Sequence, residues 1–318
     1  MTLERGFRWM RARRMRTFAS AAALALASGC GPRADADEVA RADAADAKET
    51  LECRITHPEL SLGTRVPEAS GAALDRRTRG LFWTHGDSGN DPILFAVGVN
   101  GQLLGRVRLT GARNRDWEDM AIGPCPGGTC VYVADIGNNQ ARPLDLVLYR
   151  APAPAATDSA TAPAEAFHAR FPGNGRDAEA IFVMPDGEVY IVTKGRTEPV
   201  ELWHWPTPLR AGPAVDLERV REIAPRPTQL GDYVTGAGAS RNGRWVAIRT
   251  YGRLALYRAA DLLAGGGRPY TLELAALGET WGEGVAIDDD GTVLLVSEGS
   301  GHHTGSAAAW LRCALPAT

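Results

Sequence analysis

The sequence predicts an all-β domain, a five-bladed β-propeller, and three observations lead to this fold class. Helical periodicity is weak, whereas short β-branched and aromatic runs alternate with turn signals such as Pro185-Asp186-Gly187. A small or acidic run followed by apolar strands recurs five times, at the roughly fifty-residue spacing typical of propeller blades. The last repeat lacks an outer strand, and a strand-like segment over residues 51–62 is available at the other end of the domain to complete it.

The first thirty residues have the pattern of an export signal. Four arginines between positions 11 and 16 precede a short apolar stretch over residues 18–27 that is too brief to span a bilayer. The order Ala27-Ser28-Gly29-Cys30 resembles the lipobox of bacterial lipoproteins, which implies that Cys30 is lipidated and becomes the mature N-terminus. Gly31 in the next position implies sorting to the outer membrane of the cell envelope. A cleaved secretory peptide is the alternative.

Three segments are expected: a lipoprotein signal over 1–30, a disordered tether over 31–50 and the propeller over 51–318. The tether is rich in Ala, Asp, Glu and Arg and has little to bury. The formal net charge of −3, with both signs interspersed, gives no support to nucleic-acid binding. No later apolar run approaches the length of a membrane-spanning helix, so the expected membrane contact is the lipid alone.

The cysteines predict two disulfides. With Cys30 assigned to the lipid, four cysteines remain, an even number. Cys125 and Cys130 flank a Pro-Gly-Gly-Thr turn, which favours a local bridge, and this leaves Cys53 to pair with Cys313. The second bridge would join the two ends of the domain. The alternative, zinc binding, lacks paired Cys-x-x-Cys spacing.

Each repeat predicts an inner, a second, a third and an outer strand. The inner strands are expected at 68–74, 116–122, 177–183, 234–240 and 281–287. The second strands are expected at 81–84, 131–134, 189–193, 245–248 and 293–297. The third strands are expected at 93–97, 146–149, 201–205, 254–257 and 309–312. The outer strands are expected at 103–109, 166–171, 220–223 and 270–274, with 51–62 as the fifth.

We interpret the Ala/Pro/Thr-rich stretch at 151–165 as an exposed insertion in the second blade. Irregular strands within it would instead give a six-bladed propeller, the alternative architecture.

Polar side chains recur at one point of every inner strand. Inner strands line the central tunnel of a propeller, so these oxygens would converge at one end of the axis. Three buried carboxylates repel one another and lose hydration, and a hard divalent cation would relieve the conflict. An oxygen-only ligand set favours Ca²⁺. The predicted metal ligands are Ser70, Glu118, Glu179, Thr235 and Glu283. The alternative is that the acids cap strand ends or bind basic partners.

This ring is similar to the calcium ring of the calcium-activated nucleotidases (soluble apyrases), five-bladed propellers whose pattern runs serine, glutamate, glutamate, serine, glutamate. The matching segments are Ala69-Ser70-Gly71, Trp117-Glu118, Ala178-Glu179-Ala180 and Gly282-Glu283-Gly284. Thr235 departs from that pattern but keeps the hydroxyl. The order covers all five blades, while identity is confined to these positions. The resemblance implies a calcium cofactor.

A second resemblance extends further along the chain. Segments 135–139 (Asp-Ile-Gly-Asn-Asn) and 297–299 (Ser-Glu-Gly) resemble those of an uncharacterised bacterial β-propeller lipoprotein family, which carries no secure activity. More distantly, calcium-dependent propeller esterases, lactonases and phytases share the general plan.

The loops that follow the second strands return to the face where the inner strands begin, and all five are polar and Gly-rich. Function usually concentrates on such a face of a rigid scaffold. The candidate catalytic carboxylates, as metal ligands or bases, are Asp87, Asp135 and Glu298. The candidate residues for holding a small anionic substrate are Arg142, Lys194, Arg196, Arg249 and His302, the last of which, or His303, would also shuttle protons. Ordinary turn and surface roles are the alternative for each.

Two functions are expected to compete. The first is a Ca²⁺-dependent hydrolase of a small phosphoester, ester or lactone. The second is a non-catalytic propeller that binds a ligand or partner and holds calcium for structure. No Gly-x-Ser-x-Gly, His-Glu-x-x-His or phosphate-binding glycine motif is present.

Overall fold

A computed structural model describes residues 50–300 and 305–316 of the chain. The predicted signal, Cys30, nearly all of the predicted tether, and His302 with His303 lie outside the described residues.

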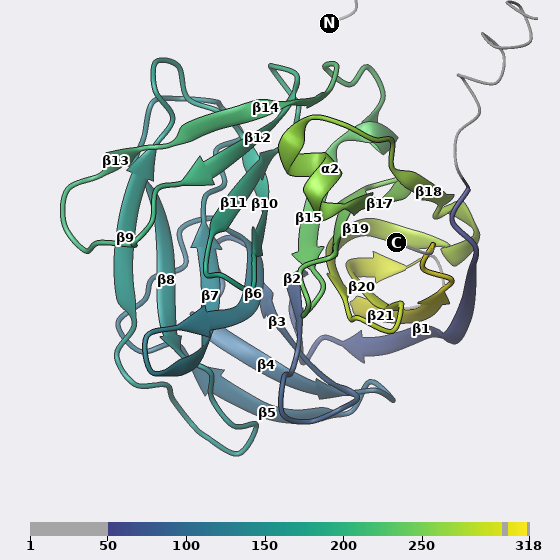
Figure 1. The fold of residues 1–318 in the computed structure, drawn as a ribbon. Coiled ribbons are helices and arrows are strands. Elements are labelled where there is room, and N and C mark those ends of the chain that lie inside the picture. Colours follow the sequence, from purple (N-terminus) through teal and green to yellow (C-terminus); the bar gives the residue numbers. More distant parts are fainter. Residues whose placement is uncertain (1–49, 301–304, 317–318) are drawn as a thin grey trace, which may run out of the picture. The chain divides into compact units, whose positions relative to one another are not determined.

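Five sheets surround a common centre, which confirms the five-bladed propeller and sets aside the six-bladed alternative (Figure 1). Blade 1 contains β2 (Ala69–Leu74), β3 (Leu81–Gly86), β4 (Ile93–Gly98) and β5 (Leu103–Arg108). Blade 2 contains β6 (Trp117–Cys125), β7 (Gly128–Asp135), β8 (Leu146–Pro152), β9 (Glu165–Arg170) and the short β13 (Val215–Asp216). Blade 3 contains β10 (Ala178–Val183), β11 (Val189–Thr193), β12 (Val200–Trp205) and β14 (Glu218–Ala224). Blade 4 contains β15 (Val234–Ala239), β16 (Trp245–Thr250), β17 (Arg253–Arg258) and β18 (Tyr270–Glu273). Blade 5 contains β19 (Glu279–Ile287), β20 (Thr292–Ser300), β21 (Ser306–Cys313) and β1 (Cys53–Gly63).

The strands of each blade pair antiparallel in chain order, apart from the closing strand and the short parallel β13. Helical turns are confined to η1 (Leu230–Asp232), α2 (Ala259–Ala264) and η2 (Ala275–Leu277) within the described part of the chain. No helix among the described residues is long and apolar enough to cross a membrane.

Blade 5 is completed by strands from both ends of the domain. The N-terminal β1 pairs antiparallel with the C-terminal β21, and Cys53 faces Cys313 in the register. Disulfides join Cys53 to Cys313 and Cys125 to Cys130, as predicted. A bridge that closes a loop this long removes much entropy from the unfolded chain, so it locks the ring against opening at blade 5.

Each hydrophobic cluster of the core lies between two neighbouring blades. Trp83 and Val107 of blade 1, for example, pack with Trp117 and Val133 of blade 2. The other four interfaces are filled in the same way, so every blade buries both faces. The strands read as continuous apolar runs for this reason.

The inner strands form a closed ring in the order β2, β6, β10, β15, β19 and back to β2. Small residues let them approach closely: a Cβ on Gly236 would lie 2.7 Å from the carbonyl oxygen of Glu283, and one on Gly284 would lie 2.4 Å from that of Ser70. At the equivalent position of blade 2 the chain instead carries Asp119, whose fully buried carboxylate fills the space left by the small residues.

Asp119 ties the inner strands together. Its carboxylate accepts hydrogen bonds from the backbone N–H groups of Met120, Ile181 and Ala237, which belong to blades 2, 3 and 4. Burial raises the pKa of this carboxyl, and the backbone donors oppose that rise. The centre of the propeller is therefore closed by a protein side chain.

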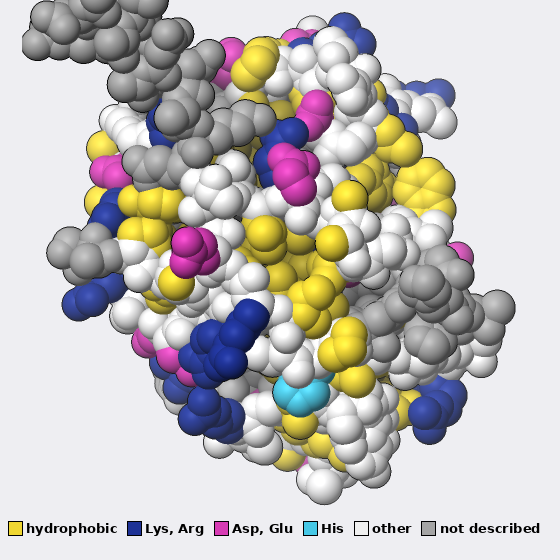
Figure 2. Space-filling view, turned by 90° about the vertical axis from the view of Figure 1, so that its right-hand side faces the viewer, with side chains coloured by type: hydrophobic (Ala, Val, Ile, Leu, Met, Phe, Trp, Pro, Cys, Tyr) yellow, Lys and Arg dark blue, Asp and Glu magenta, His cyan; other side chains and the backbone are white. Residues whose placement is uncertain are grey.

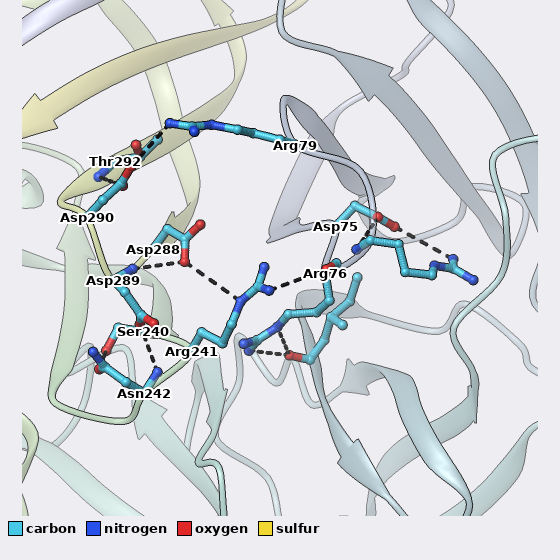
Figure 3. A network of polar contacts seen from close by, with 12 residues as sticks. Asp75, Arg76, Arg79, Ser240, Arg241, Asn242, Asp288, Asp289, Asp290 and Thr292 are labelled. Carbon is cyan, nitrogen blue, oxygen red and sulfur yellow. Dashed lines mark hydrogen bonds and ion pairs between the residues drawn. The ribbon is translucent and has the colours of Figure 1, made fainter.

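The hairpins at the far end of the axis are laced by a polar network (Figure 3). Arg241 of blade 4 donates to the carbonyl of Arg76 in blade 1 and lies 3.9 Å from Asp288 of blade 5. Arg76 in turn donates to the carbonyl of Ile122 in blade 2. These two arginines therefore join different blades through their contacts with backbone carbonyls and a carboxylate.

The insertion at 151–165 packs along the outer edge of blade 1. The N–H of Arg108 donates to the carbonyl of Ser159, and Thr161 donates back to the carbonyl of Arg108. The segment thus covers part of the edge of β5, which would otherwise present unpaired backbone groups. On the side of the molecule near β1 and β18, hydrophobic side chains gather between scattered charges of both signs (Figure 2).

Candidate functional site

A cavity of about 200 Å³ opens at the end of the axis where the inner strands begin. We call it the axial cavity. Its walls are almost entirely polar and come from all five blades. The lining residues are Ser70, Asp87, Ser88, Asp116, Glu118, Asn139, Glu179, Lys194, Arg196, Tyr251, Trp281, Glu283 and Glu298.

A β-bulge places one polar residue of each inner strand at this end. In blade 3, Ala178 pairs with Thr193 and Ala180 with Val192, so Glu179 is the extra residue between them. The same one-residue excess occurs at Glu118, at Thr235, and around Ser70 and Glu283. Bulges re-aim side chains and often lie beside functional sites.

Beyond its pairing with the residue before each bulge, the second strand, or the loop that follows it, contributes one further residue at the same repeat position in all five blades. In antiparallel pairing this residue lies opposite the position two before the ring residue: the N–H of Lys194 donates to the carbonyl of Asp177, and that of Asp87 donates to the carbonyl of Glu68. The residues at this position, from blade 1 to blade 5, are Asp87, Ile136, Lys194, Tyr251 and Glu298.

The three glutamates of the predicted ring are nearly buried, with exposed fractions of 7% for Glu118, 2% for Glu179 and 7% for Glu283. Burial raises the pKa of Glu118 and Glu283 well above the ordinary value, and neighbouring carboxylates, Glu179 above all, add to the rise. Burial likewise raises the pKa of Glu179 to about 7, against the opposing effect of Lys194. The cavity therefore holds carboxylates that are costly to ionise without a cation.

Lys194 supplies one such cation from within the protein. Its Nζ donates to Oε1 of Glu179 at 2.6 Å, and it lies 5.8 Å from the centroid of the Tyr251 ring. Burial disfavours the ammonium, but Glu179 and Tyr251 outweigh burial, so the pKa of Lys194 is raised. The predicted role of Lys194 was to hold a substrate anion, whereas here its charge is committed to Glu179.

A second group of carboxylates lies on the blade 1 and blade 2 side. Oxygens of Asp87, Asp116 and Glu118 lie within 4.8 Å of one another. Gly137 makes room for them, since a Cβ there would lie 2.0 Å from Oε1 of Glu118 and 2.4 Å from Asp116. Burial, followed by Asp87 and Asp135, raises the pKa of Asp116 to about 6. Three close carboxylates with no cation between them fit a hard divalent metal ion.

The two hydroxyls of the predicted ring are engaged elsewhere. Ser70 Oγ donates to the carbonyl of Glu118 at 2.6 Å, and Thr235 Oγ1 donates to that of Glu283 at 2.9 Å. Each bond joins neighbouring blades, and Thr235 does not line the cavity. The donor set that fits a metal is therefore narrower than the predicted ring and is displaced toward blades 1 and 2.

Two of the three candidate catalytic carboxylates line the cavity. Asp87 belongs to the cluster just described. Burial and then Asp87 raise the pKa of Glu298 to about 7, within the range of a general base. Asp135 lies outside the cavity wall, where it accepts the N–H of Asp116 and lies 3.4 Å from Arg115. Its role is to hold the loop that carries Asp116.

Of the candidate anion-binding residues, Lys194 and Arg196 line the cavity. Arg196 lines the cavity but lies 3.3 Å from the carboxylate of Asp177. Arg249 is fully buried, paired with Glu279 at 2.5 Å, and donates to two backbone carbonyls, so it is unavailable to a ligand. Arg142 is exposed and does not line the cavity, while His302 lies outside the described residues.

Five residues of the cavity are outside the predicted site: Ser88, Asp116, Asn139, Tyr251 and Trp281. Asp116 and Trp281 each lie two residues before a ring glutamate, the same repeat position as Glu68, Asp177 and Tyr233. Aligning that position across the five repeats would have identified both. The other three lie in the polar, Gly-rich loops that follow the second strands.

The comparisons with known proteins show the fold alone. No family model and no curated protein matches the chain, so neither the bacterial lipoprotein family nor the calcium-activated nucleotidases gains support from them. The PQQ-bound aldose sugar dehydrogenase of Streptomyces coelicolor aligns with a TM-score of 0.51 at 12% identity, over 84% of this chain and 100% of that one. A gluconolactonase of Xanthomonas campestris aligns with a TM-score of 0.44 at 14% identity, over 85% and 96% of the two chains.

Proposed function

We propose that the axial cavity binds Ca²⁺ and hydrolyses a small ester or lactone. The observation that carries this proposal is the surplus of acid: six carboxylates line the cavity, against Lys194 and Arg196 as the lining cations. Such an arrangement is costly for stability, and polar groups kept in costly surroundings are common at functional sites.

Asp87, Asp116 and Glu118 would hold the ion, because their oxygens already lie within 4.8 Å of one another. A bound Ca²⁺ would polarise the substrate carbonyl and favour ionisation of a water molecule. The chain's own residues supply the rest. Glu298, with a pKa near 7, accepts a proton from water at neutral pH, and the Lys194–Glu179 pair keeps a fixed positive charge on the opposite wall.

The charge of the cavity narrows the substrate class. A small anion, as the sequence suggested, would meet six carboxylates while the lining cations are already paired. Among the substrates considered, phosphoesters are therefore disfavoured, and esters or lactones without negative charge are favoured.

The alternative is a non-catalytic propeller with structural calcium. The closed axis argues against it. Asp119, Ser70 and Thr235 already join the inner strands across the blades, so the ring has side-chain ties that need no metal. An ion at the cavity would then be available for binding or chemistry.

We also propose that the protein is exported and anchored to the cell envelope through Cys30. The two disulfides support export, since such bonds persist in oxidising compartments. Incorporation of a labelled fatty acid that is lost in Cys30→Ala tests the anchor.

The test of the hydrolase compares calcium-loaded and chelated protein on panels of esters, lactones and phosphoesters. We expect turnover of an ester or lactone that chelator abolishes and that Glu118→Gln lowers at least tenfold. Glu222→Gln, on the exposed outer strand β14, is the matched control and should behave as wild type. A calcium-loaded, folded protein that is inert on every panel would overturn the proposal, and melting with and without Ca²⁺ confirms that the Glu118 variant folds.

A further inference from the structure

Trp281 stands at the mouth of the axial cavity in a strained conformation. It is 49% exposed, and its φ of 55° lies in the left-handed region that bulky side chains rarely adopt. Its ring packs edge-on against Tyr251, with centroids 5.5 Å apart. Strain of this kind costs on the order of 1–3 kcal/mol and tends to persist where function requires it.

Glu283, two residues further along the same strand, is a nearly buried carboxylate. Only 7% of the residue is exposed, and it lines the cavity. Within the described residues no hydrogen bond or ion pair joins its carboxylate to another side chain, and the charges of Lys194 and Arg249 only partly offset the rise that burial gives its pKa. This side chain is therefore suited to a ligand that brings N–H groups or positive charge.

The neighbouring wall of the same cavity shows how such a carboxylate is satisfied. In blade 3 the ammonium of Lys194 lies 2.6 Å from Glu179 and 5.8 Å from the ring centroid of Tyr251. The cavity thus already accommodates one ammonium group between a carboxylate and an aromatic ring.

Blade 5 presents the same positions with the cation missing. Glu298 occupies in blade 5 the repeat position that Lys194 occupies in blade 3, and, after burial, its charge helps to raise the pKa of Glu283. Tyr251 of blade 4 supplies the aromatic ring near Lys194, and Trp281 supplies one in blade 5, and of the two side chains Trp is the stronger partner for a cation. Among the described residues, blade 5 has no cation at this position, so a ligand can supply one.

We propose that Glu283, Glu298 and Trp281 form a subsite for the ammonium group of a small organic ligand. Glu283 accepts its N–H groups, Glu298 adds negative charge, and the indole of Trp281 covers its apolar side. If the ligand is the substrate, the hydrolysed ester or lactone carries a protonated amine, and this part of the proposal rests on the proposed function. The binding of an ammonium group at this subsite does not rest on it.

The experiment measures the affinity of the calcium-loaded full chain for cyclohexylammonium and for cyclohexanol, which share a shape and differ in charge. Binding is followed by calorimetry. We expect the ammonium to bind at least tenfold more tightly than the alcohol. Glu283→Gln should remove most of that preference, and Trp281→Ala should weaken ammonium binding about two- to fivefold. Leu230→Ala, which alters an exposed apolar residue outside the cavity lining, is the control.

Equal affinities for the two compounds, or a preference that survives Glu283→Gln in a protein with an unchanged melting profile, would overturn the subsite. The two proposals fail separately. If the protein hydrolyses an ester or lactone but binds cyclohexylammonium and cyclohexanol equally, the proposed hydrolase stands and the proposed subsite is wrong. An ammonium preference in a protein that turns over no ester or lactone would do the reverse.

Discussion

Blades 3 and 5 both have a bulge beside the axial cavity, but they differ in the charge of one residue of the second strand or the loop that follows it. Each carries a buried glutamate on a bulge of its inner strand, Glu179 in one and Glu283 in the other. The residue at the equivalent position is Lys194 in blade 3, where it donates to Glu179, and Glu298 in blade 5. At one position of the scaffold the buried glutamate is therefore either neutralised by a residue of the protein or accessible to a ligand that carries positive charge.

The energetic consequence follows from burial. The pKa of Glu179 is raised only to about 7 because Lys194 favours its ionised form, whereas that of Glu283 is raised well above its ordinary value. A paired carboxylate contributes to the fold, and an unpaired one weakens it until something binds.

The largest effect is expected from Lys194→Met, which leaves Glu179 buried without its cation. Removing one partner of a buried ion pair costs about 3–5 kcal/mol. Urea denaturation at pH 7.5 should therefore show a loss of this order, and the additional change Glu179→Gln should recover much of it. A loss well below about 1 kcal/mol would mean that the pair does not close the charge of blade 3.

The next effect concerns pH in the metal-free protein. The folded-state pKa values of Glu179 and Glu298 are about 7, and that of Asp116 is about 6, all raised above those of the unfolded chain. The folded state therefore binds more protons than the unfolded state between about pH 4 and pH 7, so stability should rise as pH falls through this window.

Melting of chelated protein from about pH 8 down to about pH 5 should show Tm increasing by several degrees, since one kcal/mol corresponds to about 2–4 °C for a domain of this size. Saturating Ca²⁺ should flatten the slope by favouring the ionised carboxylates. A Tm that falls steadily with acidification would contradict the assignment of these groups.

A smaller effect is expected from Glu298→Lys, which gives blade 5 the charge pattern of blade 3. A new ammonium beside Glu283 should raise stability at neutral pH by about 1–2 kcal/mol. The same change should lower the affinity for cyclohexylammonium by more than tenfold. Glu298→Gln is the control, because it removes the negative charge without supplying a cation.

The smallest effect compares Trp281→Gly with Trp281→Ala. At a positive φ the Cβ of alanine costs about 1 kcal/mol that glycine does not, so the glycine variant should be the more stable of the two. This reverses the usual order in strands. Thermal melting of both variants measures it, and an alanine variant that is equally stable would indicate that the backbone at Trp281 relaxes.

Much of the fold was predictable because its signals are local. Turn residues and short apolar runs give the strands, five similar runs give the blades, and the missing outer strand points to residues 51–62. The pairing of Cys53 with Cys313 followed by elimination and agrees with the strand count. Repetition also placed Glu118, Glu179 and Glu283 at one level of the axis, where all three line one cavity.

The partners of these residues were not predictable, because they depend on register across the bulges and on packing between blades. Arg249 belongs to a polar loop in the sequence, yet its guanidinium lies inside the protein against Glu279. In the sequence Asp119 is only the neighbour of Glu118, yet in the fold its carboxylate joins the inner strands of blades 2, 3 and 4. A bulge adds one residue and so changes the face toward which a side chain points. The charged groups near that side chain depend on how the five blades pack together.

The blade pattern, the closure by both chain ends, the disulfides and the level at which the acids gather follow from short-range patterns repeated along the chain, and the fold set aside the six-bladed alternative. The ion pair of Lys194 with Glu179, and the lack of a paired cation at Glu283 among the described residues, could be seen only in the folded protein. Both depend on contacts between segments distant along the chain, where burial turns small differences in position into large differences in electrostatic free energy.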